Sequence, residues 1–190
     1  MSRNLKHTVL AALALGAAWA HGVPAAASDA RELIALPDQV RDGFLTEMRG
    51  HMGNLDDIPA ALAAGDFKQA ANIADIRMDF GHVMWEGMMA QGMTADEALA
   101  MKEKMRAQGM GMGQGMGQGR GQGRGMGMGR FMPDDFRAMG SGLHEAAAAF
   151  AARARAAETP PTVKDFQDTM DALQGVTAVC RGCHETYRVR

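Results

Sequence analysis

The sequence predicts an all-α protein, an antiparallel four-helix bundle with a disordered Gly/Met-rich loop between the second and third main helices. Three observations predict it. Apolar residues recur at spacings of three and four, helix-capping motifs precede these runs, and no segment has the pattern of a strand. Amphipathic helices joined by loops of varied length bury their apolar faces together in a bundle.

The first 27 residues are predicted to be a secretory signal peptide. Arg3 and Lys6 supply its positive charge, residues 9–18 are apolar, and small residues lead to a cleavage site after Ala27. The apolar run is too short to span a bilayer, and an uncleaved anchor is the alternative. Cleavage changes the formal charge from −2 to −4 and leaves residues 28–190 as one soluble periplasmic domain, a poor partner for nucleic acid.

The first helix is expected to begin at Asp38, directly after Pro37. Pro59 should kink the helix or end its regular part. The stripe expected to face the bundle comprises Leu45, Met48, Met52, Leu55, Pro59 and Leu62, flanked by Phe44, His51 and Ile58.

The second helix is expected to begin after Asp66, which forms a capping box with Gln69. Its apolar stripe runs without interruption from Phe67 to Met88. A further capping box, Thr94 with Glu97, opens a shorter helix that ends near residue 107.

A glycine-rich segment follows, in which every odd-numbered residue from Gly109 to Gly129 is glycine. Such a segment supports neither a helix nor a lone strand, so residues 108–130 are expected to form a disordered loop. Thioethers suit cuprous copper, so metal handling by the loop is one open role. Its candidate ligands are Met110, Met112, Met116, Met126 and Met128.

The third helix is expected to begin at Pro133 and to end near residue 157. Prolines at 160 and 161 separate it from the fourth helix, which Thr162 and Asp165 cap. On the fourth helix, residues at alternating spacings of four and three are expected to face the core. They are Phe166, Met170, Leu173, Thr177, Cys180, His184 and Tyr187.

The fourth helix ends in Cys180-Arg-Gly-Cys183-His184, the C-x-x-C-H haem-attachment motif. On a helix, residues at positions i, i+3 and i+4 lie within about 100° of one another. Two thiols so placed can add to the two vinyl groups of one porphyrin, while the next imidazole ligates the iron. We therefore expect one covalent haem c, bound by Cys180 and Cys183 and ligated by His184.

Other interpretations of the two cysteines are weaker. A thioredoxin-like pair usually lies at a helix N-terminus, where the dipole lowers the thiol pKa, and this pair lies near a C-terminus. Structural zinc would need a distant histidine such as His51 or His144, and no second paired-ligand motif is present. An accidental match is the remaining alternative.

On these residues the chain resembles the cytochrome c′ family. The resemblance rests on the C-terminal motif, on Arg41 to Met52, on Leu143-His144-Glu145-Ala146 and on Gly65-Asp66. It implies a haem that is five-coordinate or Met-ligated, periplasmic electron transfer and often a homodimer. It also implies that Arg41 lies near a haem propionate and that Leu45 covers the distal face, where low-spin relatives carry methionine. The Gly/Met-rich loop has no counterpart in this family pattern.

The sixth coordination position stays open at this point. Met48, one turn beyond Leu45, is the first alternative ligand, and core packing is its other interpretation. His51, His82 and His144 are further alternatives. We expect a non-enzymatic electron carrier that exchanges electrons with periplasmic redox proteins. Binding of nitric oxide or carbon monoxide at an open sixth site is the alternative function.

Overall fold

The computed structural model describes residues 29–109 and 128–190. The predicted signal peptide lies outside the described residues, and so does the predicted loop apart from its two ends. The described residues contain six α-helices, so the prediction of an all-α protein is confirmed. None of these helices is long and apolar enough to cross a membrane.

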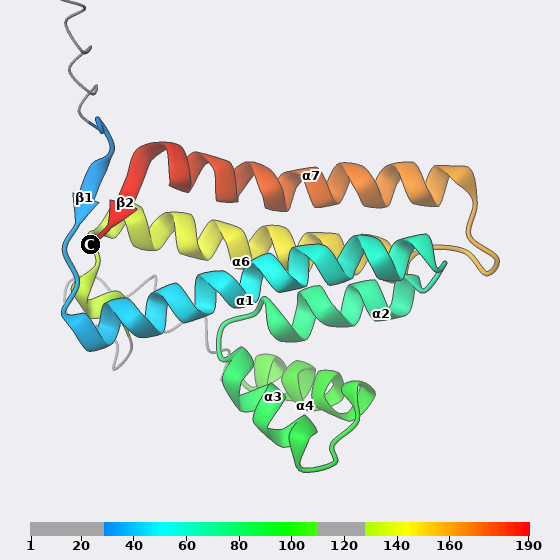
Figure 1. The fold of residues 1–190 in the computed structure, drawn as a ribbon. Helices are drawn as coiled ribbons and strands as arrows, with labels where there is room; N and C mark the ends of the chain where they lie inside the picture. Colours follow the sequence, from blue (N-terminus) through cyan, green and yellow to red (C-terminus); the bar gives the residue numbers. More distant parts are fainter. Residues whose placement is uncertain (1–28, 110–127) are drawn as a thin grey trace, which may run out of the picture. The chain divides into compact units, whose positions relative to one another are not determined.

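Four long segments pack side by side within the unit Arg31–Arg190 (Figure 1). They are α1 (Asp38–Ala63), α2 (Phe67–Asn72) with its π-helical continuation η1 (Ile73–Arg77), α6 (Asp134–Arg155) and α7 (Val163–Thr186). Helix α1 packs on α2, α2 on α6, and α6 most extensively on α7. Close backbone approaches between α1 and α7 are much sparser, and we call the region between these two helices the α1–α7 seam.

Helix α1 begins at Asp38 as predicted, but it continues through Pro59 to Ala63. The expectation that Pro59 ends the regular part is therefore wrong: the helix continues for one more turn without the hydrogen bond that the missing N–H of Pro59 would have donated. The face turned to the core also differs from the predicted stripe. It comprises His51, Asn54, Ile58 and Leu62.

The N-cap of the second helix is confirmed, since the Asp66 side chain accepts a 2.8 Å hydrogen bond from the Gln69 backbone N–H. The predicted uninterrupted helix to Met88 is wrong. The chain leaves η1 and turns at Gly81, whose φ of +79° is accessible to glycine at little cost. A new helix, α3 (His82–Ala90), then begins.

Helix α4 (Ala95–Ala107) begins and ends as predicted, with the Thr94–Glu97 capping box in place. Helices α3 and α4 pack on each other and on η1. Between them they bury a small separate core of Ile76, Trp85 and Ala98.

Helix α7 begins after the predicted capping box of Thr162 and Asp165. Its buried residues are Thr169, Leu173 and Val176. The predicted core-facing stripe is thus only partly correct. Phe166 and Met170 are 37% and 42% exposed.

Two three-residue strands were not predicted. Strand β1 (Glu32–Ile34) pairs in parallel with β2 (Tyr187–Val189), with Glu32 opposite Tyr187. They bring the start of the described chain to the end of α7 (Figure 1). The 3-10 turn η2 (Met128–Phe131) precedes α6, so the last residues of the predicted loop have a defined backbone.

Candidate functional site

The C-x-x-C-H motif occupies the last two turns of α7. Cys180 and Cys183 are half-buried free thiols, and His184 is exposed. Cys180 packs against the main hydrophobic core, whereas Cys183 packs against the cluster of Ile34, Leu36, Phe136 and Tyr187. The two thiols therefore border different parts of the core, and the imidazole that follows them lies at the surface.

The environment of the thiols does not favour thiolate chemistry. Burial raises the pKa of Cys180, and burial together with the nearby Cys180 raises the pKa of Cys183. Both thiols are therefore protonated at neutral pH, unlike those of disulfide oxidoreductases. Among the described residues, no group of three or more His, Cys, Asp or Glu side chains stands ready to hold a metal ion, so the zinc alternative lacks a preformed ligand set there.

Three aromatic rings connect the end of α7 to the first turns of α1. Tyr187 lies edge-on against Phe136 with ring centroids 5.1 Å apart, and Phe136 lies 5.6 Å from Phe44. Cys183 packs against this same cluster. The segment of α1 that carries Leu45 therefore lies at the same end of the domain as the C-terminal motif.

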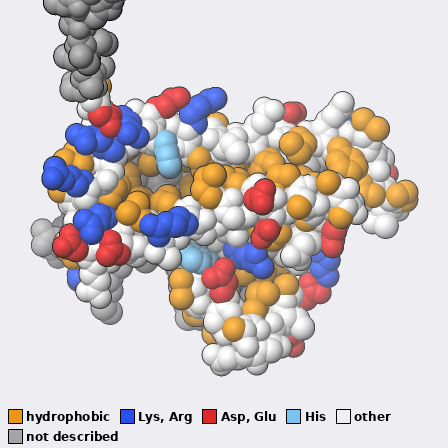
Figure 2. Space-filling view, in the orientation of Figure 1, with side chains coloured by type: hydrophobic (Ala, Val, Ile, Leu, Met, Phe, Trp, Pro, Cys, Tyr) orange, Lys and Arg blue, Asp and Glu red, His pale blue; other side chains and the backbone are white. Residues whose placement is uncertain are grey.

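Apolar side chains are exposed on both helices that border the seam. Met52 of α1 is 65% exposed, and Phe166 and Met170 of α7 are also exposed. Leu45 and Met48 are half-buried. Figure 2 shows hydrophobic side chains on the surface along α1 and α7. Two thiols and an imidazole near the end of α7, together with apolar side chains exposed on α1 and α7, are a donor set and a surface that suit a flat, apolar macrocycle.

Basic side chains gather at the end of the molecule where the strands lie (Figure 2). Arg41 forms ion pairs of 3.1 Å with Asp38 and with Asp42, so acidic neighbours already occupy its guanidinium. The propionate contact of Arg41 stays a prediction. Arg31 donates a 3.3 Å hydrogen bond to the backbone carbonyl of His184, and Arg188 donates one of 3.4 Å to the carbonyl of Arg31.

Sequence reasoning missed these last two arginines. The strand pairing that brings Arg31 beside the motif involves only three residues on each side, and such short strands have no recognisable periodicity. The three histidines considered as alternative axial ligands do not lie beside the C-terminal motif as a group. The structure brings His51, His82 and His144 together at a place of their own, where His51 lies 6.3 Å from each of the other two rings between centroids.

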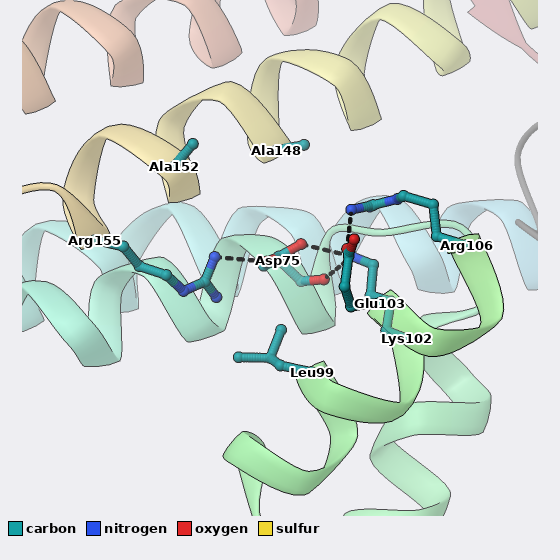
Figure 3. Close-up of a pocket in the computed structure, with 8 residues that line it drawn as sticks. All are labelled: Asp75, Leu99, Lys102, Glu103, Arg106, Ala148, Ala152 and Arg155. Atoms are coloured by element: carbon teal, nitrogen blue, oxygen red, sulfur yellow. Dashed lines mark hydrogen bonds and ion pairs between the residues drawn. The ribbon is translucent and has the colours of Figure 1, made fainter.

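A cavity of about 320 Å³ lies between η1, α4 and α6 (Figure 3). Its charged side chains are paired with one another. Asp75 contacts Lys102 at 2.5 Å and Arg155 at 2.6 Å, while Arg106 pairs with Glu103 at 2.9 Å. This network joins three elements, and its internal pairing indicates a structural role.

Comparisons with known protein families, with characterised proteins and with solved structures find no match for this chain.

Proposed function

We propose that the protein is a periplasmic c-type cytochrome of the cytochrome c′ type, which carries one covalent haem and transfers electrons. The observation that carries this proposal is the placement of Cys180, Cys183 and His184 in the last two turns of α7, at the end of the domain where α1 begins. The raised pKa values of both thiols support haem attachment over thiol–disulfide chemistry, and among the described residues the two cysteines belong to no ligand set for zinc.

The residues of α7 would hold the group covalently. Each thiol adds its S–H across one vinyl C=C bond, which forms a thioether and a new C–H bond and needs no oxidant. His184 would ligate the iron through its imidazole. When bound, haem supplies a one-electron ferric/ferrous couple whose potential depends on the axial ligands and on burial.

The bundle architecture belongs to the same proposal. Helix α1 packs on α2, α2 on α6 and α6 on α7, whereas close backbone approaches between α1 and α7 are few. In an antiparallel four-helix bundle this pair would close the ring, and the haem would occupy the space between them.

The rest of the chain favours a carrier over an enzyme. The mature charge of −4 is suited to transient, charge-assisted docking with periplasmic redox proteins. Arg31, which donates a hydrogen bond to the His184 carbonyl, and Arg188, which donates one to the Arg31 carbonyl, are candidates to neutralise haem propionates together with Arg41. A homodimer is the further expectation that the family resemblance supplies.

The second candidate function is binding of diatomic gases. Leu45, at the position expected over the distal face, is half-buried and cannot ligate iron. An apolar side chain there would leave room for nitric oxide or carbon monoxide only. Addition of nitric oxide to the reduced protein should change the visible spectrum. An unchanged spectrum with a far-red sulfur-to-iron band would exclude this function.

The proposal is tested by maturing the full chain in a host with haem-ligation machinery. The double variant Cys180→Ala/Cys183→Ala should lose all covalently bound haem in a denaturing gel stained for haem. The matched control is Arg181→Ala, which changes an exposed residue between the cysteines and should retain haem at the wild-type level. Equal haem staining of the double variant and the wild type would contradict the proposal.

A further inference from the structure

Three histidines from distant parts of the chain meet at one place. His51 lies in α1, His82 is the first residue of α3, and His144 lies in α6. They are all the histidines of residues 28–190 other than His184. The His51 ring lies 6.3 Å from the ring of His82 and 6.3 Å from that of His144, between centroids.

Two of these imidazoles have ring nitrogens without a hydrogen-bond partner in the protein. His51 is only 7% exposed, and neither of its ring nitrogens is paired. Both ring nitrogens of His82 are buried and have no hydrogen-bond partner either, although carboxylates lie 3.5 and 3.9 Å from them. Buried polar atoms are normally hydrogen-bonded, because an unsatisfied one is costly. The two unpaired nitrogens of His51, beside two further imidazoles, therefore indicate a missing electrophilic partner.

The third imidazole is held in place by its surroundings. Nδ1 of His144 donates a 2.6 Å hydrogen bond to the backbone carbonyl of Met78. The Phe80 ring lies against it, with centroids 3.7 Å apart. This hydrogen bond leaves Nε2 of His144 as a lone-pair donor. A backbone carbonyl on the far nitrogen is the usual support for a metal-ligating histidine.

Carboxylates lie within reach of the same cluster. Oε1 of Glu47 is 3.9 Å from Nε2 of His82, and Oε2 of Glu86 is 3.5 Å from Nδ1 of His82. Burial, together with the neighbouring His144 and His82, lowers the pKa of His51 to about 4. His51 is therefore neutral at pH 7, the form in which an imidazole binds metal.

We propose that His51, His82 and His144, with Glu47 as the fourth ligand, bind one divalent transition-metal ion of the Zn²⁺ class. Imidazole and carboxylate donors together suit Zn²⁺ and similar ions, whereas Mg²⁺ and Ca²⁺ prefer oxygen donors alone. This site is separate from the haem-attachment motif and does not depend on it.

The ring spacing is close to what such an ion requires. Two imidazoles bound to one Zn²⁺ at about 2.0–2.1 Å have ring centroids roughly 5–6 Å apart. As they stand, no group of the described side chains is arranged to hold a metal ion, so binding would have to draw the rings together by about 1 Å from the observed 6.3 Å. His82 is well placed to move, because it follows the left-handed residue Gly81 at the start of a short helix.

The test is calorimetric titration of Zn²⁺ into the purified, haem-loaded full chain at pH 7. We expect one equivalent to bind, and His51→Gln, His82→Gln and His144→Gln each to weaken binding at least tenfold. Glu47→Gln should weaken it by a smaller factor. The matched control Glu103→Gln, an exposed carboxylate on α4, should bind as the wild type does. Circular dichroism identifies any histidine variant that fails to fold. In that case the Zn²⁺ affinity of Glu47→Gln is compared with that of the wild type instead.

X-ray absorption at the zinc edge separates this site from the cysteines. A first shell of nitrogen and oxygen only is expected, even if the chain carries no haem and its thiols are free. Sulfur in the shell, absence of binding up to millimolar Zn²⁺, or wild-type affinity in all three histidine variants would overturn the proposal.

Discussion

The ring of Tyr187 lies nearly perpendicular to that of Phe136, at 86° and 5.1 Å between centroids, three residues after the exposed imidazole of His184. This contact fixes the end of α7 against the start of α6. The β1–β2 pairing begins at the same residue, Tyr187. The position of the C-terminal motif therefore depends on a tertiary contact just beyond the helix that carries it.

Replacing Tyr187 with alanine should lower the free energy of unfolding by about 3 kcal/mol, because it removes a buried aromatic ring and an edge-to-face pair. Tyr187→Phe retains both and should cost less than about 1 kcal/mol. Urea denaturation followed by circular dichroism measures these differences. Val163→Ala, at a position 74% exposed, is the control and should change the stability by less than about 0.5 kcal/mol. Equal losses for all three variants would refute the anchoring role.

The Asp75 network should contribute measurably to the docking of α4. Burial acts to raise the pKa of Asp75, but its contacts with Lys102 and Arg155 outweigh burial and lower it. Asp75→Asn removes the charge that both cations share and should cost about 2 kcal/mol, which is less than for a fully buried pair because Lys102 retains Asp79. The exposed ion pair between Glu103 and Arg106 is the comparison. Glu103→Gln should lower the free energy of unfolding by less than about 1 kcal/mol, measured by urea denaturation.

The histidine cluster predicts a pH dependence of stability without added metal. The pKa of His51 is about 4 in the folded protein and about 6.5 when unfolded. The unfolded state therefore binds more protons between these values, so stability is complete above pH 6.5 and falls as the pH drops towards 4. The loss should be on the order of 3 kcal/mol.

The variant His51→Leu should flatten that profile, since leucine cannot take up a proton. Urea denaturation at half-unit steps between pH 7 and pH 4 gives the comparison. A wild-type profile with the same slope as the variant would assign the pH dependence to other groups, such as His144, whose pKa burial also lowers.

The sixth coordination position can be tested with Met48. If this half-buried side chain packs beside the haem without ligating it, Met48→Leu should leave the oxidised visible spectrum unchanged and alter stability by less than about 1.5 kcal/mol. Loss of a far-red charge-transfer band in the variant would instead identify Met48 as the ligand.

The sequence predicts the helices well where their ends are chemically marked. The capping boxes at Thr94 and Thr162 and the N-cap at Asp66 set three helix starts, because a side chain there satisfies free N–H groups. The break at Gly81 was missed because the apolar spacing continues across it. A glycine that adopts a positive φ cannot be distinguished by periodicity from one inside a helix.

The assignment of faces was less successful. On α1 the predicted stripe lies roughly a quarter turn from the buried one, since methionine and proline were counted as core residues at exposed positions 52 and 59. The C-x-x-C-H motif can be found from sequence because attachment to a single haem fixes the spacing of its three residues. The convergence of His51, His82 and His144 cannot be, because it depends on how α1, α3 and α6 pack.

The most direct test of the central claim is the visible absorption spectrum and intact mass of the full chain, produced with haem-ligation machinery. A coloured protein is expected, whose mass exceeds that of the processed polypeptide by one haem and whose two cysteines resist alkylation under denaturing conditions. A colourless protein of unmodified mass, in which both Cys180 and Cys183 react with the alkylating reagent, would contradict the claim.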